Sequence, residues 1–318
     1  MLKKTIPQRS YRARNWPEYN RALKNRGRLG LWIDQSTIEN WNEPRQEGKN
    51  GRPKAYSDEA IKCALTIRLM FNLPLRATEG FLSSLFECMN LALSVPDYTL
   101  ICKRQKTLGL PNLQAKKASN KPITDIVIDS TGVKVYGEGE WKVKVHGASK
   151  RRKWRKVHIA IDPETGEIVA EKTTDNDSGD AEELPGLLEQ IKTNLGKVLA
   201  DGAYDTCECH EEIQKRNAQA VIPPRSNACL WPEKGPDHPR NKALFFIARN
   251  GSKAWKEKSG YHTRSLVETS MYRLKTIFTG RLKSRLLKHQ KLECRLMCMM
   301  LNKLSSLGMP DSYPVSIA

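Results

Sequence analysis

The stretch Ile126-Val127-Ile128-Asp129 decides the fold that we expect for this chain. Its three apolar residues predict a short buried strand that ends at an aspartate. The pattern returns further along the sequence as Val198-Leu199-Ala200-Asp201, which predicts a second buried strand with an aspartate at its end. We therefore expect Asp129 and Asp201 to follow two strands of one sheet.

The segments around these two strands complete a regular order of strands and helices. We expect further strands at residues 133–136, 157–161, 168–170 and 221–222, and helices at 184–192, 206–216 and from about 261 onward. The order strand, strand, strand, helix, strand, helix, strand, helix is that of the ribonuclease H-like architecture, an α/β fold whose first and fourth strands lie side by side. The final helix would cross the same end of the sheet and bring Glu268 to the two aspartates.

Three carboxylates at one point suit the cleavage of phosphodiester bonds. That reaction needs an activated nucleophile and neutralisation of the charge that develops on the phosphate, and two divalent ions about 3.5–4 Å apart supply both. Magnesium prefers oxygen ligands, so carboxylates are its natural partners. A single aspartate after a strand is usually a turn or cap residue. The prediction that Asp129, Asp201 and Glu268 hold Mg²⁺, with Mn²⁺ as a substitute, therefore depends on all three together.

The helix expected from about residue 261 carries a second pattern. Tyr261, Arg264, Glu268 and Lys275 follow one another at offsets that place them within about 60° on a helix. A charged stripe of this kind is usually a solvated face. Here it continues into a basic segment, residues 269–292, that has no acidic residue. We expect Tyr261, Arg264 and Lys275 to contact DNA next to the carboxylates.

The charge of the whole chain points to a polyanionic partner. Its 318 residues include 54 Lys and Arg against 35 Asp and Glu, a formal net charge of +19. Such an excess favours binding to nucleic acid through phosphate contacts. A second acid-free basic segment, residues 142–156, adds Arg151 and Arg152 to the expected DNA contacts. No apolar run is long enough to span a membrane and no secretion signal is visible, so a cytoplasmic, nucleoid-associated protein is expected.

The N-terminal third has the composition of a helical DNA-binding region. Residues 1–50 mix basic and aromatic side chains, a composition that suits phosphates and stacking but also fits a small aromatic core. Ser57, Thr78 and Pro96 mark the starts of three short helices, which resemble a helix-turn-helix unit. The third helix carries Lys103 and Arg104 as expected DNA contacts.

Polar and charged segments divide the chain into four parts. We expect a DNA-binding region at 1–113, a linker at 114–122, the catalytic domain at 123–300 and a tail at 301–318. The eight cysteines are scattered, and Cys207, Cys209 and His210 fall on one expected helix, where neighbouring side chains point apart. Buried free thiols in a reducing compartment are therefore expected rather than a zinc site.

The spacing Tyr261-x2-Arg264-x3-Glu268-x6-Lys275 resembles the Y-R-E-K signature of bacterial insertion-sequence transposases with a DDE catalytic triad. Residues 128–132 and 137–141 look like the first catalytic block of that family, and residues 199–205 look like the second. Residues 19–34 are similar to the insertion-sequence-five group. The resemblance implies Asp129, Asp201 and Glu268 as metal ligands and Arg264 and Lys275 as contacts to the transposon ends. Only 66 residues separate Asp201 and Glu268, so a large β-rich insertion is not expected.

The resemblance implies a transposase that works as a homo-oligomer on double-stranded DNA. Residues 1–113 would bind the terminal inverted repeats, and residues 123–300 would cut the element's ends and join their 3′-hydroxyls to target DNA. Two alternatives stay open: a ribonuclease H-like nuclease without strand transfer, and an inactive DNA-binding derivative.

Overall fold

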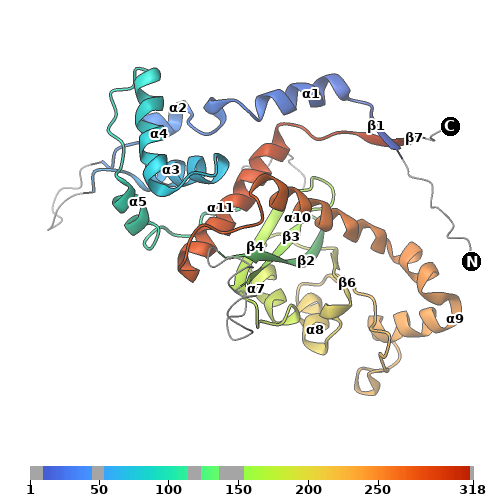
Figure 1. The fold of residues 1–318 in the computed structure, drawn as a ribbon. Coiled ribbons are helices and arrows are strands. Elements are labelled where there is room, and N and C mark those ends of the chain that lie inside the picture. Colours follow the sequence, from blue (N-terminus) through green and yellow to red (C-terminus); the bar gives the residue numbers. More distant parts are fainter. Residues whose placement is uncertain (1–9, 45–53, 114–122, 136–153, 316–318) are drawn as a thin grey trace, which may run out of the picture.

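A five-stranded mixed sheet forms the centre of the molecule (Figure 1). The computed structural model describes residues 10–44, 54–113, 123–135 and 154–315. The strand order is β4-β3-β2-β5-β6; β4, β3 and β2 pair antiparallel, and β5 and β6 run parallel to β2. The strands are β2 (Asp125–Lys134), β3 (Trp154–Ile161), β4 (Ile168–Asp175), β5 (Lys197–Leu199) and β6 (Gln219–Val221). The expected α/β class and the expected pairing of the first and fourth strands are confirmed.

The first strand is longer than the sequence indicated. The strands expected at 126–129 and 133–136 are one strand, β2, so Asp129 lies within a strand rather than at its end. The pairing of β2 with β3 continues without a break because no turn-forming pair of residues interrupts it. The Trp154 ring covers Gly132: a Cβ atom built on this glycine would lie 3.4 Å from Cε3 of the ring. Tyr136 lies outside the described residues. Residues 168–170 open a full strand, β4, so three strands still precede the first helix.

Two hydrophobic layers cover the faces of the sheet. On one face Val127 and Ile159 pack with α10 (Ser265–Ile277) and α11 (Leu287–Ser306). On the other, Ile126 and Ile128 pack with α7 (Leu184–Leu188) and α8 (Cys207–Lys215). This alternation follows from the two-residue period of a strand. Asp129 lies two residues after Val127, so its side chain is on the same face of the sheet and points toward α10.

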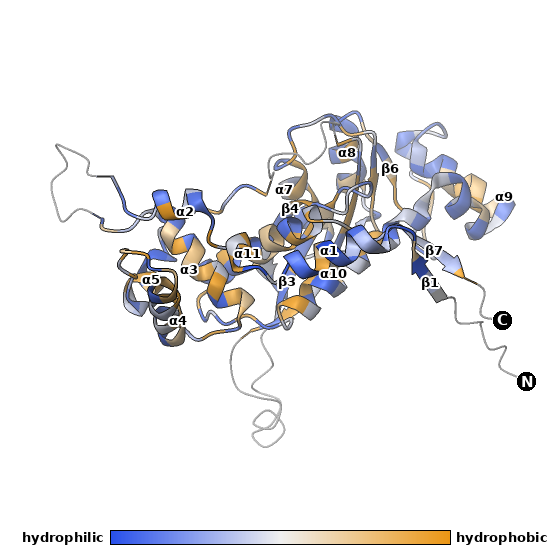
Figure 2. Ribbon diagram, turned by 90° about the horizontal axis from the view of Figure 1, so that it is seen from above, coloured by the Kyte–Doolittle hydropathy of each residue, from blue (hydrophilic) through white to orange (hydrophobic). Residues whose placement is uncertain are grey.

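The N-terminal helices share their core with α11, which lies between them and the sheet (Figure 2). These helices are α2 (Gln35–Glu39), α3 (Asp58–Met70), α4 (Leu75–Cys88) and α5 (Tyr98–Arg104). Helix α1 (Trp16–Asn25) and a 3₁₀ turn at Leu29–Leu31 precede them. The Ser57 hydroxyl caps α3, as expected. The expected cap at Thr78 is wrong. Helix α4 already begins after Pro74, and the Thr78 hydroxyl donates to the Pro74 carbonyl at 3.0 Å.

The end of the chain is more ordered than a tail. Helix α11 runs past residue 300 and buries Leu301 and Leu304. Strand β7 (Ser312–Val315) then pairs antiparallel with β1 (Ser10–Ala13), so the two ends of the described chain meet. Among the described helices, none combines the length and the apolar composition that a membrane span requires.

The segment before α10 also differs from the expectation of one long helix. A kinked helix, α9 (Pro239–Ser259), extends from the body, and Gly251 interrupts it with a φ of 83°. Gly260 ends α9 in the left-handed region, and Tyr261–Arg264 form a 3₁₀ turn, η5, before α10 begins. A second turn, at Thr279 and Gly280, separates α10 from α11.

Candidate active site

The strand register brings the two aspartates to the same level. Val127 pairs with Leu199, and Asp129 and Asp201 each lie two residues further along parallel strands. The Asp129 carboxylate is half-buried and accepts a hydrogen bond from the Ser130 amide at 2.8 Å. Asp201 lies two residues after the end of β5, where its carboxylate accepts a hydrogen bond from the Ala203 amide at 2.9 Å and caps the 3₁₀ turn Gly202–Tyr204. Both carboxylates are therefore fixed by local backbone contacts.

Helix α10 places Glu268 near Asp129 through an arginine. The helix buries Val267 and Met271 against the sheet, which leaves Glu268 at its margin with 60% of its side chain exposed. Arg264 Nη1 donates to Glu268 Oε1 at 2.6 Å, and Arg264 Nη2 lies 3.4 Å from Asp129 Oδ2. One guanidinium thus bridges a strand carboxylate and a helix carboxylate.

The electrostatics show three acids acting on one point. Burial raises the pKa of Asp129, the Ser130 amide and Arg264 oppose this, and Asp201 and Glu268 raise that pKa further. Burial disfavours the charged form of Arg264, but Asp129, Tyr261 and Glu268 outweigh it and raise the pKa of the guanidinium. Clustered carboxylates repel one another, so the group is stable only with a cation among them. In this structure that cation is Arg264.

The carboxylate oxygens have the chemistry of a magnesium site, but their present arrangement is that of an ion-pair cluster. Within the described ranges, no three or more His, Cys, Asp or Glu side chains stand close enough together to hold a metal ion as they are. Hard oxygen donors from three separate elements are the ligand type that Mg²⁺ takes. The donor set fits the ion, and Arg264 contacts two of its three members.

Tyr261 lies beside this cluster and packs against α9. Its ring is 5.8 Å from the Trp255 ring at 43°, and burial raises the pKa of its hydroxyl. Tyr261 and Arg264 belong to the 3₁₀ turn, whereas Glu268 and Lys275 belong to α10. The four residues therefore do not form one continuous α-helical stripe, because Gly260 starts a tighter turn before α10.

The remaining expected DNA contacts have different environments. Lys103 is exposed on α5, and Lys275 lines a groove that is described below. Arg104 is only 8% exposed, and its guanidinium is held by Asp58 and donates to the Tyr56 carbonyl. In this structure Arg104 thus fixes α5 to the start of α3 and presents no donor surface to DNA. Arg151 and Arg152 lie outside the described residues.

A buried polar network behind the site was not visible in the sequence. Arg240, at the start of α9, donates to both oxygens of Asp205 at 2.7 and 3.0 Å and stacks 3.9 Å from the centre of the Trp231 ring. His210 Nε2 lies 3.4 Å from the same carboxylate. This network connects α9 to the segment that follows Asp201. In the sequence, Asp205 is distinguished only by its position four residues after Asp201. Its partner Arg240 is 35 residues away, so no local pattern links the two.

The cysteines near this network are free thiols. Cys209 is buried on α8, and its Sγ lies 3.4 Å from the Ala181 carbonyl. Cys207 Sγ lies 3.4 Å from Glu211 Oε1 on the same helix. The two side chains therefore have different partners.

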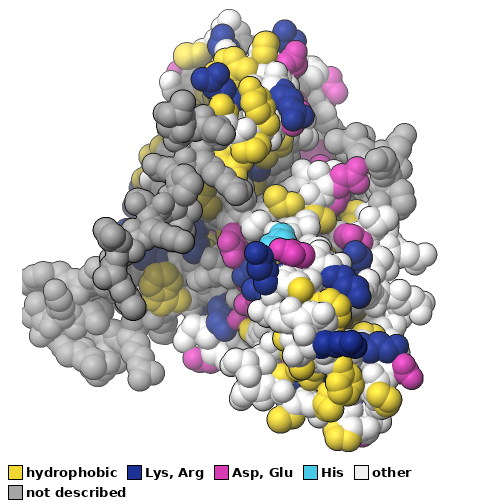
Figure 3. Space-filling model, turned by 90° about the vertical axis from the view of Figure 1, so that its right-hand side faces the viewer, with side chains coloured by type: hydrophobic (Ala, Val, Ile, Leu, Met, Phe, Trp, Pro, Cys, Tyr) yellow, Lys and Arg dark blue, Asp and Glu magenta, His cyan; other side chains and the backbone are white. Residues whose placement is uncertain are grey.

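Figure 3 views the side of the molecule that carries α9, where acidic and basic side chains lie next to one another.

Comparisons with known proteins identify the family. Residues 120–303 match a family model described as "Transposase DDE domain", and residues 24–138 match a second model with the same description. An uncharacterized protein of Aquifex aeolicus (strain VF5) is 25% identical over 281 residues, which cover 81% of this chain and 78% of that protein.

Two solved structures are similar at low sequence identity. One is a piggyBac transposase synaptic complex with hairpin DNA, with 12% identity, a TM-score of 0.42, and coverage of 93% of this chain and 76% of that one. The other is a pre-cleavage Mos1 transpososome, with 10% identity, a TM-score of 0.22, and coverage of 84% and 83%. Since the first family model covers more than half of the 318 residues, the chain belongs to the transposase DDE domain family.

Proposed function

We propose that this protein is the transposase of an insertion sequence, with a ribonuclease H-like catalytic domain at residues 123–300. It would cut phosphodiester bonds at the ends of its element and join the freed 3′-hydroxyls to target DNA. The observation that carries the proposal is the contact of Arg264 with both Asp129 and Glu268, at the end of the sheet where the strand register brings Asp201 level with Asp129. Family membership supports the reaction class.

The three carboxylates would hold Mg²⁺, with Mn²⁺ as a substitute. Asp129 is a short side chain on β2, Asp201 is a short side chain just after the adjacent strand β5, and the longer Glu268 reaches from a helix. When bound, divalent ions would activate the attacking oxygen and neutralise charge on the phosphate. Arg264 would then be released from the carboxylates, and its planar guanidinium could donate two hydrogen bonds to one phosphate.

The DNA would run along the side of the molecule that carries η5 and α10. Tyr261 would stack near the cut, Arg264 and Lys275 would contact phosphates, and Lys103 would contribute from the N-terminal region, which would recognise the terminal inverted repeats. Arg151 and Arg152 stay proposed contacts of the basic segment 142–156. Cutting both ends of one element requires more than one catalytic site, so we propose a homo-oligomer in the synaptic complex.

Isosteric variants of the three acids test the proposal. Asp129→Asn, Asp201→Asn and Glu268→Gln should each lower cleavage of an end-containing duplex about a thousandfold or more in Mg²⁺, since each removes a ligand charge. Binding of the same duplex in EDTA should be kept. Glu208→Gln, at an exposed position on α8, is the matched control and should cleave normally.

The same assay separates the proposed reaction from its alternatives. A precut duplex with a free 3′-hydroxyl should be joined to a target plasmid by the wild type and by the Glu208→Gln control. Cleavage without joining would identify a nuclease. Normal cleavage by any one of the three acid variants would remove that residue from the site.

A further inference from the structure

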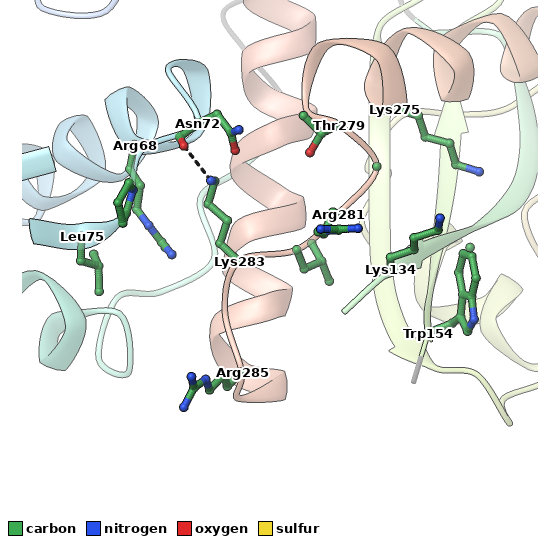
Figure 4. Close-up of a pocket in the computed structure, with 14 residues that line it drawn as sticks. Arg68, Asn72, Leu75, Lys134, Trp154, Lys275, Thr279, Arg281, Lys283 and Arg285 are labelled. Atoms are coloured by element: carbon green, nitrogen blue, oxygen red, sulfur yellow. Dashed lines mark hydrogen bonds between the residues drawn. The ribbon is translucent and has the colours of Figure 1, made fainter. Parts of the chain in front are cut away.

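A basic groove lies where the N-terminal helices, the sheet and the α10–α11 turn meet (Figure 4). Its volume is about 950 Å³. Six cationic side chains line it, and no Asp or Glu of the described ranges does so: Arg68, Lys134, Lys275, Arg281, Lys283 and Arg285. Six positive charges around one cavity repel one another, so this groove is suited to a ligand with several negative charges.

The walls of the groove are fixed to one another by hydrogen bonds. The Lys134 amide donates to the Gly280 carbonyl at 3.0 Å, and the Leu282 amide donates to the Lys134 carbonyl at 2.7 Å, which joins the α10–α11 turn to the end of β2. Lys283 Nζ donates to the Asn72 carbonyl at 2.9 Å, which joins the same turn to the α3–α4 connection. The groove is therefore a built feature of the fold and not a gap between independent parts.

Arg68 is a buried cation whose Nε has no hydrogen-bond partner within the described residues. The residue is 7% exposed. Glu293 is the acid that acts on it electrostatically, but that carboxylate already accepts from the Lys283 and Ser284 amides at 2.7 and 3.0 Å. A buried charge without a hydrogen-bonded partner is costly, and an anion in the groove would reduce that cost.

The groove begins close to the carboxylate cluster. Lys275 lines the groove and lies seven residues after Glu268 on α10, which is about 10 Å along a helix. This distance is about three base steps of a duplex. Trp154 adds an aromatic surface beside Lys134, whose Nζ lies 5.6 Å from the centre of the ring.

The turn that forms the groove carries a strained residue. Thr279 has a φ of 63°, a left-handed conformation that a β-branched residue rarely adopts. Gly280 follows in the same region with a φ of 59°. Such strain persists where the surrounding structure requires it, and it is frequent at ligand-binding sites. Here it directs Arg281 and Lys283 into the groove (Figure 4).

We infer that this groove binds the sugar-phosphate backbone of the DNA that leads to the carboxylate cluster, and that the α3–α4 connection forms part of the DNA path. The inference rests on the proposed function, because it takes DNA as the substrate. It adds a binding surface to which both the N-terminal helices and the catalytic domain contribute, with Arg68, Lys134, Arg281 and Lys283 as its phosphate contacts.

The test is DNA binding by the full chain in EDTA, so that it does not depend on cleavage. A Lys134→Ala, Arg281→Ala double variant removes two exposed cations of the groove. The control is Lys215→Ala, Lys242→Ala, which removes two exposed cations on α8 and α9 that pair with Glu212 and Asp237. Fluorescence anisotropy with a labelled duplex should show about tenfold weaker binding for the groove variant, at two- to fivefold for each contact. Its salt slope, log K against log salt, should be shallower by about 1.8.

Three results would overturn the inference. One is an equal loss of affinity in both double variants, which would mean a general charge effect. Another is an unchanged salt slope in the groove variant. The third is displacement of the labelled duplex by inorganic phosphate at a concentration no higher than that of the duplex's own phosphates, which would indicate a site for free phosphate. If the groove variant binds normally while the three acid variants fail to cleave, the groove inference fails and the proposed function stands. If the acid variants cleave and the groove variant loses binding, the three acids are not the catalytic site, and the groove remains a DNA-binding surface.

Discussion

Removal of the Arg264 side chain should have opposite effects in the metal-free and the metal-bound protein. In this structure Arg264 contacts Glu268 at 2.6 Å and Asp129 at 3.4 Å, so Arg264→Ala leaves two carboxylates without their cation. The variant should be less stable than the wild type without metal. It should also bind Mg²⁺ more tightly, because the ion would no longer compete with a guanidinium for the same oxygens.

The size of both effects follows from the burial of the partners. The pair with Glu268 is an exposed contact between residues four apart, which is worth about 0.3–0.5 kcal/mol. The pair with Asp129 joins side chains that are 17% and 15% exposed, so we place it at about 1–1.5 kcal/mol, between a surface pair and a buried one. The variant should then lose roughly 1.5–2 kcal/mol. With an unfolding entropy of about 2.1 cal/mol/K per residue, this lowers the Tm of a 318-residue chain by about 2–3 °C.

Titration calorimetry and thermal unfolding over a series of Mg²⁺ concentrations measure the second effect. Release of the Asp129 contact corresponds to about a tenfold change in Kd, so Arg264→Ala should bind Mg²⁺ about tenfold more tightly than the wild type. Lys275→Ala removes an equal charge from α10, where Lys275 makes no ion pair with a carboxylate of the described residues, and it should leave the Mg²⁺ affinity within about twofold. Equal or weaker Mg²⁺ binding by Arg264→Ala would refute the reasoning. The salt slope of DNA binding then tells whether Arg264 also contacts a phosphate, since that slope should become shallower by about 0.9.

Two further predictions follow from parts of the fold outside the carboxylate cluster. Burial alone would raise the pKa of Asp205, but the close His210 imidazole and the hydrogen bonds from Arg240 outweigh it and lower that pKa to about 2. The contribution of Asp205 to stability is therefore complete above about pH 5 and is lost as the pH falls toward 2. Urea unfolding at pH 5 and pH 3 should show the wild type losing about 1 kcal/mol more than Asp205→Asn, whereas parallel losses would contradict the assignment. A fragment of residues 1–113 should fail to unfold cooperatively in a thermal scan, because its apolar helix faces pack on α11 in the whole chain; a sharp transition like that of the full chain would show an independent domain.

The sequence predicted the parts of the fold that depend on local patterns. Apolar runs that ended at Asp129 and Asp201 were sufficient to place two neighbouring strands, because parallel strands with buried faces have few polar residues. The Ser57 cap of α3 and the helix at 206–216 were also predicted from local signals.

Features that depend on contacts between distant residues could not be predicted. The merging of two expected strands into β2 depends on the long partner strand β3, which supplies a continuous ladder. Arg104 lies on the basic third helix, but its burial depends on Asp58, 46 residues away. The network of Asp205 and Arg240 has no fixed spacing that a motif could record.

The sequence named the residues of the candidate site, but it did not predict all the contacts among them. Spacing indicated that Arg264 and Glu268 share one side of a helix, and their contact in the structure agrees with this. The contact of Arg264 with Asp129 crosses from the start of a helix to the middle of a strand, so only the tertiary packing reveals it.

The pairing of β1 with β7 has a consequence for the synthesis of the protein. Residues 10–13 are synthesised about 300 residues before their partners at residues 312–315. At about 5–20 residues per second, the first strand waits roughly 15–60 s for the second. The ribbon of β1 and β7 can therefore form only after residue 315 has been made, and a chain that stops earlier keeps β1 as an unpaired edge strand. Such an edge is a template for pairing with other chains, so incomplete products should aggregate while complete ones do not.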